Sequence, residues 1–271
     1  MENINIGFIG AGNMATALIG GLCKSGFDSE RLYVSDRDEE KMMPLANTFQ
    51  INTCASNQAL IDECQVVVLA VKPQAMHEVI SELQIGDSKC LYLSIAAGIP
   101  TDHLRNWFGQ DVALVRAMPN TPALVQTGAT GLYANQAVTQ EQQQIAEDIM
   151  AAIGIALWVG KESQLDAVTA LSGSGPAYFF YMMEAMEQAG NEMGLNEDLV
   201  HKLTVQTALG AAKLAQSATE SPAQLRKRVT SPGGTTEAAI NHMQSENGLN
   251  IIKQAVLEAK QRSEELAKEL G

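Results

Sequence analysis

A short glycine-containing turn near the amino terminus constrains the fold most. The apolar run 3–9 is typical of a buried strand, and it leads directly into Gly10-Ala11-Gly12-Asn13-Met14-Ala15. Apolar residues then follow at helical spacing, at Met14, Leu18, Ile19 and Leu22. A strand, a Gly-x-Gly-x-x-Ala turn and a helix in this order are typical of a dinucleotide-binding corner. There, Gly10 makes the tight bend, Gly12 lets a pyrophosphate reach the backbone, and Ala15 lets helix and strand pack closely.

Asp36 and Arg37 follow the second expected strand, 31–35, where such corners bind the adenosine ribose. Asp36 comes 21 residues after Ala15, and a carboxylate at this distance usually accepts hydrogen bonds from the ribose hydroxyls, which favours NAD. Arg37 can instead bind a 2′-phosphate, which favours NADP. The residues leave both alternatives open, and we expect both cofactors, NADPH and NADH, to be used.

The first part of the chain alternates between strand-like and helix-like segments. Strands are expected at 3–9, 31–35, 51–54, 65–71, 89–94, 111–117, 127–134 and 155–159, and helices at 38–49, 57–62, 74–83, 101–108 and 139–153. The run 65–71 is almost wholly aliphatic, as in strands that are covered on both faces. This alternation predicts an α/β fold with a Rossmann-like, doubly wound, mainly parallel sheet in a first domain, 1–160.

The carboxyl ends of these strands are expected to face the cofactor, because open α/β sheets bind ligands there. Val71-Lys72-Pro73 closes the strand 65–71 and is predicted to lie against the cofactor, although Lys72 is alternatively a surface charge. The small residues Ile95-Ala96-Ala97-Gly98 follow 89–94 and leave room for a flat ring such as nicotinamide.

A proline-bracketed turn, Met118-Pro119-Asn120-Thr121-Pro122, follows the strand 111–117. Proline fixes the backbone, so the turn is stiff. It either holds the Asn120 amide toward the site or only reverses the chain.

The chain after Gly160 contains no strand-like run. Helices are expected at 162–171, 177–193, 196–217, 223–228, 236–246 and 248–270, with a break at Ser172–Pro176. We predict an all-α second domain, 161–271, whose apolar helix faces are buried against a partner chain in a homodimer or a larger homo-oligomer built from dimers. One stripe is interpreted as packing rather than a binding site: Tyr178, Phe179, Tyr181, Met182 and Met186.

Composition argues against several classes of function. A formal net charge of −13 argues against a nucleic-acid partner, because phosphate neutralisation needs a basic face. The cysteines and histidines are scattered without metal-ligand spacing, so no metal site is predicted: Cys23, Cys54, Cys64, Cys90, His77, His103, His201 and His242. The start, 1–3, lacks the basic residues of a signal peptide, and no run suits a membrane helix. We expect a cytoplasmic protein.

A second glycine-containing loop comes late in the chain. The basic triplet Arg226-Lys227-Arg228 precedes Ser231-Pro232-Gly233-Gly234-Thr235-Thr236, which opens an alanine-rich helix. Glycines permit close approach of a ligand to the backbone, and the first N–H groups of a helix favour a carboxylate or phosphate. The alternative is an ordinary helix N-cap.

Several sequence blocks together resemble the pyrroline-5-carboxylate reductase family. In the family's order they are Ile-Gly-Phe-Ile-Gly-Ala-Gly-Asn-Met-Ala at 6–15, Leu-Ala-Val-Lys-Pro at 69–73, Ala-Ala-Gly at 96–98, Met-Pro-Asn-Thr-Pro at 118–122, Leu-Ser-Gly-Ser-Gly-Pro-Ala-Tyr at 171–178 and Ser-Pro-Gly-Gly-Thr-Thr at 231–236. The last two are the most specific. This family reduces 1-pyrroline-5-carboxylate to L-proline with NADPH or NADH, in the final step of proline synthesis.

The resemblance implies roles for individual residues. Cofactor contacts are implied at Ile9, Gly10, Ala11, Gly12, Asn13, Met14, Asp36, Asn57, Ala70, Val71, Lys72, Pro73, Ile95, Ala96 and Ala97. A substrate carboxylate is implied at Ser231, Gly233, Gly234, Thr235 and Thr236. Thr236 matches the family threonine whose hydroxyl meets the ring nitrogen. Many members carry a small or hydroxyl residue in place of Asp36, and an acidic one near Lys227.

Two rival functions remain open from the residues alone. One is a different imine reductase or a hydroxy-acid reductase of the same architecture. A hydroxy-acid enzyme should place a catalytic lysine or histidine in the helical domain, where Lys202 and His201 are candidates by residue type. A nucleotide sensor without catalytic activity would keep Gly10–Ala15 but would have no reason to keep Ser231–Thr236.

Overall fold

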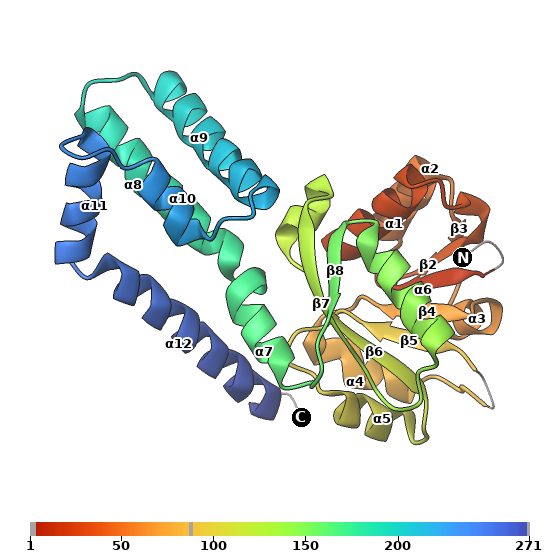
Figure 1. Cartoon of the computed structure of the whole chain (residues 1–271). Coiled ribbons are helices and arrows are strands. Elements are labelled where there is room, and N and C mark those ends of the chain that lie inside the picture. The colour runs from red at the N-terminus through yellow and green to blue at the C-terminus, as the bar shows by residue number, and fades with distance from the viewer. Residues whose placement is uncertain (1–3, 87–88, 270–271) are drawn as a thin grey trace. The chain divides into compact units, whose positions relative to one another are not determined.

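The computed structural model describes residues 4–86 and 89–269 (Figure 1). Residues 1–3 and 270–271, at the ends of the two predicted domains, lie outside the described residues. These include Asn3, the first residue of the predicted first strand, and Leu270, the last residue of the predicted last helix. Within the described residues the chain forms two compact units. The first comprises 4–174 together with 259–269, and the second comprises 175–258.

The first unit is built on one eight-stranded sheet, within the residues that the structure describes, with the strand order β3-β2-β1-β4-β5-β6-β7-β8. The strands are β1 (Ile6–Ile9), β2 (Leu32–Ser35), β3 (Asn52–Thr53), β4 (Val66–Leu69), β5 (Leu91–Ser94), β6 (Ala113–Met118), β7 (Gly128–Ala134) and β8 (Gly154–Trp158). All neighbouring strands are parallel except β6 and β7. The predicted Rossmann-like, doubly wound, mainly parallel sheet is therefore confirmed.

The antiparallel pair follows from the short connection between its strands. Between β6 and β7 the chain forms only the 3-10 helix η2 (Thr121–Val125). A parallel crossover needs a dozen or more residues and usually a helix, so this connection returns the chain beside β6 in the opposite direction.

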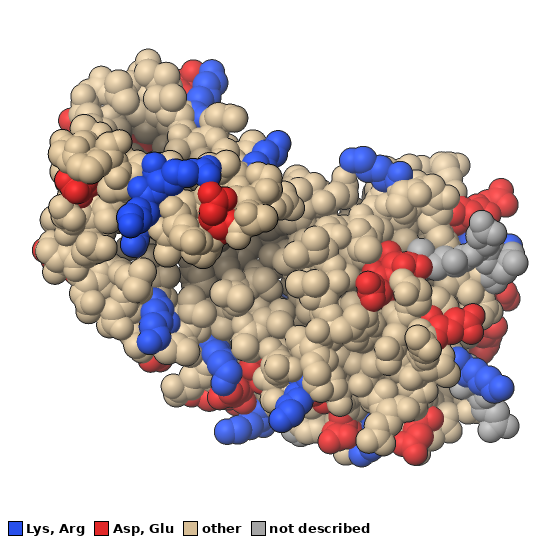
Figure 2. Space-filling model, viewed as in Figure 1, with Lys and Arg blue, Asp and Glu red and all other residues tan. Residues whose placement is uncertain are grey.

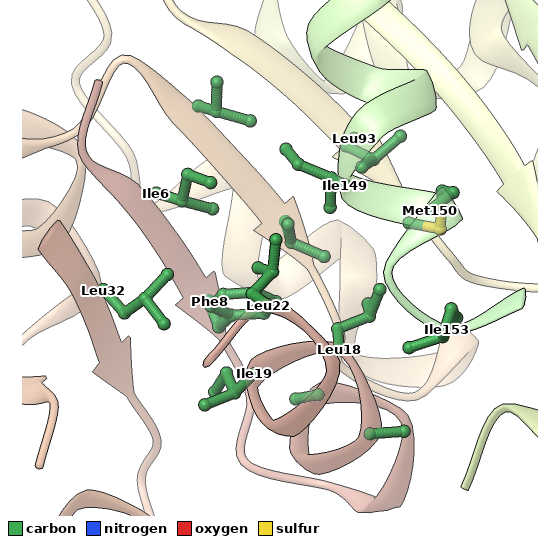
Figure 3. Close-up of a cluster of buried hydrophobic side chains, with 14 of the residues drawn as sticks. Ile6, Phe8, Leu18, Ile19, Leu22, Leu32, Leu93, Ile149, Met150 and Ile153 are labelled. Atoms are coloured by element: carbon green, nitrogen blue, oxygen red, sulfur yellow. The ribbon is translucent and has the colours of Figure 1, made fainter. Parts of the chain in front are cut away.

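Six α-helices connect and cover the parallel part of the sheet: α1 (Asn13–Lys24), α2 (Glu39–Phe49), α3 (Asn57–Glu63), α4 (Pro73–Ser81), α5 (Thr101–Phe108) and α6 (Gln140–Ala151). Alternate strand residues enter two different cores. One core joins Ile6 and Phe8 of β1 to α1 and α6, through the apolar side chains in Figure 3, which include Leu18, Ile19, Leu22, Ile149, Met150 and Ile153. The other joins Ile9, Val67 and Leu69 to α3, α4 and α5. Each fully buried aliphatic side chain contributes about 1.5–3 kcal/mol, so two filled faces hold the sheet.

The predicted break at Ser172–Pro176 is a change of helix type and not a loop. Helix α7 (Gln164–Val168) continues as a π-helical turn, η3 (Thr169–Gly173), and only Ser174 separates it from α8 (Gly175–Glu192). The Ser174 N–H donates to the Thr169 carbonyl, five residues back, at 2.8 Å. Pro176 has no N–H to continue the α-helical ladder, which accounts for the change here.

The second unit is helical throughout. It contains α8, α9 (Glu197–Ser217), α10 (Pro222–Arg228), α11 (Thr235–Ser245) and the first part of α12 (Gly248–Glu269). Helices α8 and α9 pack so closely at Gly190 that a side chain there would collide with Val200. Most apolar side chains of this unit stay exposed, including Phe179 at 65% and Tyr181 at 76%. Among the described helices, none is long and apolar enough to cross a membrane.

Candidate functional site

The carboxyl ends of four parallel strands lie level at one edge of the sheet. Ile9 of β1 pairs with Ser35 of β2 and with Leu69 of β4, and Leu69 pairs with Ser94 of β5. Backbone hydrogen bonds continue this alignment past the strands. The N–H groups of Gly10, Ala70 and Ile95 donate to Ser35, Ile9 and Leu69, at 2.8, 2.8 and 3.3 Å. The structure therefore brings together four segments that sequence reasoning assigned to the cofactor: 9–14, 36–37, 70–73 and 95–97.

The two glycines of the first turn differ in whether the backbone requires a glycine. Gly10 has φ +105°, and a Cβ there would lie 2.8 Å from the Ala70 carbonyl oxygen, so only glycine fits. Gly12 is the N-cap of α1 with φ −79° and no side-chain cap. A Cβ on Gly12 would meet nothing within 4 Å. The first N–H groups of α1 thus border open space, which fits the pyrophosphate of a dinucleotide.

Asp36 lies beside this turn and is held there by two backbone groups. Its Oδ2 accepts a hydrogen bond from the Ala11 N–H at 2.7 Å, and its Oδ1 accepts one from the Asp38 N–H at 2.9 Å. Each carboxylate oxygen has a second lone pair, so both can also accept a ribose hydroxyl. The position fits the ribose-binding carboxylate of a dinucleotide site.

Arg37 points to two carboxylates at the carboxyl end of α4. Its Nη1 lies 2.9 Å from Glu78 of α4, and its Nη2 lies 3.3 Å from Glu82, the C-cap residue that follows α4. A hydrogen bond to Glu78 and the charge of both carboxylates raise the pKa of Arg37. Neither partner was predicted from the sequence, although a spacing of four residues is that of neighbours on one side of a helix.

The other predicted cofactor residues line the same edge. Asn57 begins α3, and its Oδ1 accepts a hydrogen bond from the Ser35 hydroxyl at 2.8 Å. Lys72 is the exposed N-cap of α4, and Pro73 is the first residue of that helix. The remaining members range from buried to exposed: Ile9, Ala11, Asn13, Met14, Ala70, Val71, Ile95, Ala96 and Ala97.

The second glycine loop lies in the other unit, at the start of α11. Gly233 has φ +72°, which favours glycine, and the Gly234 N–H donates to the Ser231 carbonyl at 3.0 Å. Gly234 is the N-cap of α11 and carries no side-chain cap. Thr235 and Thr236 are the first two residues of the helix, and both are exposed. Because Gly234 occupies the cap, Thr236 does not cap the helix.

Glu237 is a residue of this loop that sequence reasoning missed. Its carboxylate accepts a hydrogen bond from the Gly233 N–H at 2.8 Å. It is the third residue of α11, where glutamate commonly reaches back to an N–H at the helix start, and this pattern is a signal that the sequence carries.

Positive charge gathers just before this loop. Figure 2 shows the blue side chains over α10, which ends in Arg226, Lys227 and Arg228. Arg228 forms an ion pair with Glu220 at 2.6 Å. The Arg226 carbonyl accepts a hydrogen bond from the Thr230 hydroxyl at 2.6 Å, which links α10 to the loop. A carboxylate or phosphate is the charge type that such surroundings favour.

Residues that could support a rival function have structural partners instead. Asn120 donates to the Ser172 carbonyl at 3.0 Å and accepts from the Ala129 N–H at 2.9 Å, so its amide stabilises the chain reversal. His201 contacts Glu187 at 2.9 Å and Lys202 contacts Asp198 at 2.7 Å, each on an exposed helix surface. Across residues 4–86 and 89–269, no group of three or more His, Cys, Asp or Glu side chains could hold a metal ion.

Comparisons with known proteins agree with this architecture. A family model for pyrroline-5-carboxylate reductase dimerisation matches residues 162–266, and one for NADP oxidoreductases dependent on coenzyme F420 matches 5–98. A solved pyrroline-5-carboxylate reductase from Coxiella burnetii is 43% identical, with a TM-score of 0.93 over 97% of this chain and 98% of that one. The Plasmodium falciparum pyrroline carboxylate reductase with NADP bound is 29% identical, with a TM-score of 0.86 over 98% of this chain and 99% of that one.

The most extensive sequence match among these is to a curated bacterial enzyme. The pyrroline-5-carboxylate reductase of Pseudomonas aeruginosa is 50% identical over 272 residues, which cover 100% of both chains. The glycine-containing turn, the level strand ends and the loop before α11 all fall within the matched length. This chain belongs to the pyrroline-5-carboxylate reductase family.

Proposed function

We propose that this chain reduces 1-pyrroline-5-carboxylate to L-proline with NADPH or NADH, as the final step of proline synthesis. One observation carries the proposal: identity of 50% along the full length of a pyrroline-5-carboxylate reductase. The two glycine-containing loops support it, because one suits a dinucleotide and the other suits the carboxylate of a small substrate.

The first unit would bind the cofactor at the level edge of its sheet. The N–H groups of the first turn of α1 would hold the pyrophosphate, and Asp36 would accept hydrogen bonds from the adenosine ribose. When bound, the cofactor supplies the hydride. Further contacts are proposed at Ile9, Gly10, Ala11, Gly12, Asn13, Met14, Arg37, Asn57, Ala70, Val71, Lys72, Pro73, Ile95, Ala96 and Ala97.

The loop before α11 would bind the substrate through its carboxylate, at Ser231, Gly233, Gly234, Thr235 and Thr236. The Gly233 N–H already donates a hydrogen bond to the Glu237 carboxylate, so the substrate carboxylate would have to displace Glu237 to accept that hydrogen bond. The imine carbon of the protonated substrate is already electrophilic, so the reaction needs placement more than acid–base help. Placement can contribute about 7–11 kcal/mol to lowering a barrier. Thr236 would be the catalytic residue, its hydroxyl orienting the ring nitrogen.

Domain roles and assembly follow from the same comparison. The match to a dimerisation model over 162–266 indicates a homo-oligomer. We infer a dinucleotide-binding domain at 1–160, and a substrate-binding and dimerisation domain at 161–271. The exposed apolar side chains of α8 would be buried in a homodimer or in a larger assembly built from dimers. Sedimentation that finds a stable, active monomer would overturn this assembly.

Surroundings and partners are part of the same proposal. A net charge of −13 supports a chain with no nucleic-acid partner. We further propose that the chain acts on a small molecule in the cytoplasm, away from membranes.

The proposal is tested by following NAD(P)H oxidation with 1-pyrroline-5-carboxylate and identifying the product. We expect L-proline in equal amount to the cofactor oxidised. A chain that binds NAD(P)H but does not oxidise it in the presence of any substrate would be a nucleotide sensor. Oxidation with a 2-keto acid, and none with the cyclic imine, would identify the hydroxy-acid reductase instead.

A further inference from the structure

We propose that Glu78 and Glu82 determine which nicotinamide cofactor this chain prefers. By binding Arg37 they keep its guanidinium from a 2′-phosphate, so that NADH binds more tightly than NADPH. The inference rests on the proposed function only in assigning the edge of the sheet near Asp36 to the adenosine ribose.

The negative charge at the end of β2 is fixed in place. Two backbone N–H groups hold the Asp36 carboxylate beside the glycine turn, at 2.7 and 2.9 Å. Glu39 and Glu40 add two carboxylates in the first turn of α2. Like charges at short range repel, so these groups disfavour a 2′-phosphate more than a 2′-hydroxyl.

The basic side chains that directly follow β2 are already bound to carboxylates. Arg37 and Lys41 are the two basic side chains that follow β2 before the middle of α2. The Arg37 guanidinium reaches Glu78 with one nitrogen and Glu82 with the other. Lys41 lies 2.6 Å from Asp38. A two-nitrogen contact uses the same fork of the guanidinium with which arginine binds phosphate.

The ion pairs of Arg37 with Glu78 and Glu82 weaken NADPH binding without preventing it. The Arg37 side chain is 60% exposed, and exposed ion pairs are individually weak. A 2′-phosphate can therefore compete with the two glutamates for Arg37. Removing both carboxylates should make the guanidinium available and shift the preference by a measurable factor.

The test measures dissociation constants of NADH and NADPH by cofactor fluorescence, without substrate. We expect wild type to bind NADH more tightly. The double variant Glu78→Gln and Glu82→Gln should bind NADPH about three- to tenfold more tightly, with NADH affinity changed less than about twofold. Because no pyrroline-5-carboxylate is present, the result stands whether or not that compound is the substrate.

Two further variants separate this account from general electrostatics. Arg37→Gln added to the double variant should abolish the gain in NADPH affinity. The control is the double variant Glu63→Gln and Glu141→Gln, which also removes two negative charges. Glu63 ends α3, just before β4, and Glu141 lies in the first turn of α6, which follows the antiparallel strand β7; both residues are exposed. This control should change neither constant. Wild type that prefers NADPH, or a gain that survives Arg37→Gln, would overturn the proposal.

Discussion

The two glycine-containing loops have the same local design but different support. Gly12 and Gly234 are both extended N-cap residues without a side-chain cap, with φ and ψ of −79° and 178° in one, and −87° and 170° in the other. In both loops a preceding glycine takes a positive φ, +105° at Gly10 and +72° at Gly233. Each loop therefore uses one glycine for its backbone conformation and one as a helix start without a side-chain cap. A Cβ on Gly12 would meet nothing within 4 Å, whereas one on Gly234 would lie 3.1 Å from the Ser231 carbonyl oxygen.

The difference lies in what holds each loop. Backbone hydrogen bonds from adjacent strands fix the first turn, and the Ala70 carbonyl closes against Gly10. In the second loop, Gly233 and Gly234 are held by Glu237 and Ser231, only three or four residues away, and the surface around them is exposed. The comparison teaches that the sheet gives the first site a rigid frame, whereas the second depends on local contacts.

The largest effect is expected from Gly12→Val. A Cβ there meets nothing within 4 Å and the backbone suits any residue, so the fold should survive. The β-branched side chain would fill the space over α1, so we expect NAD(P)H affinity to fall about a hundredfold or more, by loss of the N–H contacts. Cofactor titration beside a melting curve measures this.

Gly10→Ala is the matched contrast within the same turn. Its Cβ would lie 2.8 Å from a backbone oxygen at a positive φ, so it should lower the melting temperature. A folded Gly12→Val that binds NAD(P)H as tightly as wild type would remove the distinction between the two glycines.

Gly234→Val should show that the two sites bind different ligands. A Cβ at Gly234 would lie 3.1 Å from the Ser231 carbonyl oxygen, so the loop must shift, and the side chain would cover the helix start. We expect KM for pyrroline-5-carboxylate to rise about tenfold or more, since the carboxylate loses charge-assisted hydrogen bonds. NADH affinity, measured on the same preparation, should be unchanged. If NADH binding weakens equally, the loop does not act as a separate substrate site.

Thr236→Ala should reduce turnover without reducing stability. Its hydroxyl is assigned to the ring nitrogen, and losing one such hydrogen bond costs about 1–3 kcal/mol, or roughly tenfold to a hundredfold in kcat/KM. Because Gly234 holds the cap position, the melting temperature should stay near that of wild type. Thr236→Ser keeps a hydroxyl and should recover most of the activity. A lower melting temperature with normal kinetics would mean that Thr236 is structural.

Local patterns predicted the sheet and the placement of the first glycine turn. Runs of apolar residues gave the strands, and the Gly-x-Gly-x-x-Ala spacing gave the strand–turn–helix corner. The reversal at β7 was not read from the sequence, because it depends on the connection length after β6 and not on the pattern of β7 itself. The π-helical turn at Thr169–Gly173 was missed for a similar reason: apolar periodicity does not distinguish closely related helix types.

Long-range polar contacts were beyond the reach of sequence reasoning. From the sequence, Arg37 was interpreted only as a possible ligand of a 2′-phosphate, and only the packing of α4 brings Glu78 and Glu82 to it. The roles assigned to the cofactor and substrate residues remain predictions, which the variants above test. What the structure adds is their proximity: segments far apart in the chain meet at one sheet edge, since parallel strands end there together.

The smallest effect is expected from Glu237→Gln, which tests how far the second loop depends on local contacts. The Glu237 carboxylate accepts the Gly233 N–H, which is the group proposed to bind the substrate carboxylate, so it competes for that donor. Glutamine keeps an acceptor oxygen but removes the negative charge beside the incoming anion. We therefore expect KM for pyrroline-5-carboxylate to fall about two- to threefold, with a loss of stability of about 0.3–1 kcal/mol because an acidic residue leaves the helix start. The decrease in KM should shrink as salt concentration rises, since screening weakens the repulsion. Steady-state kinetics at low and high salt measure both effects. A raised KM at every salt concentration would show that Glu237 organises the loop for the substrate and does not compete with it.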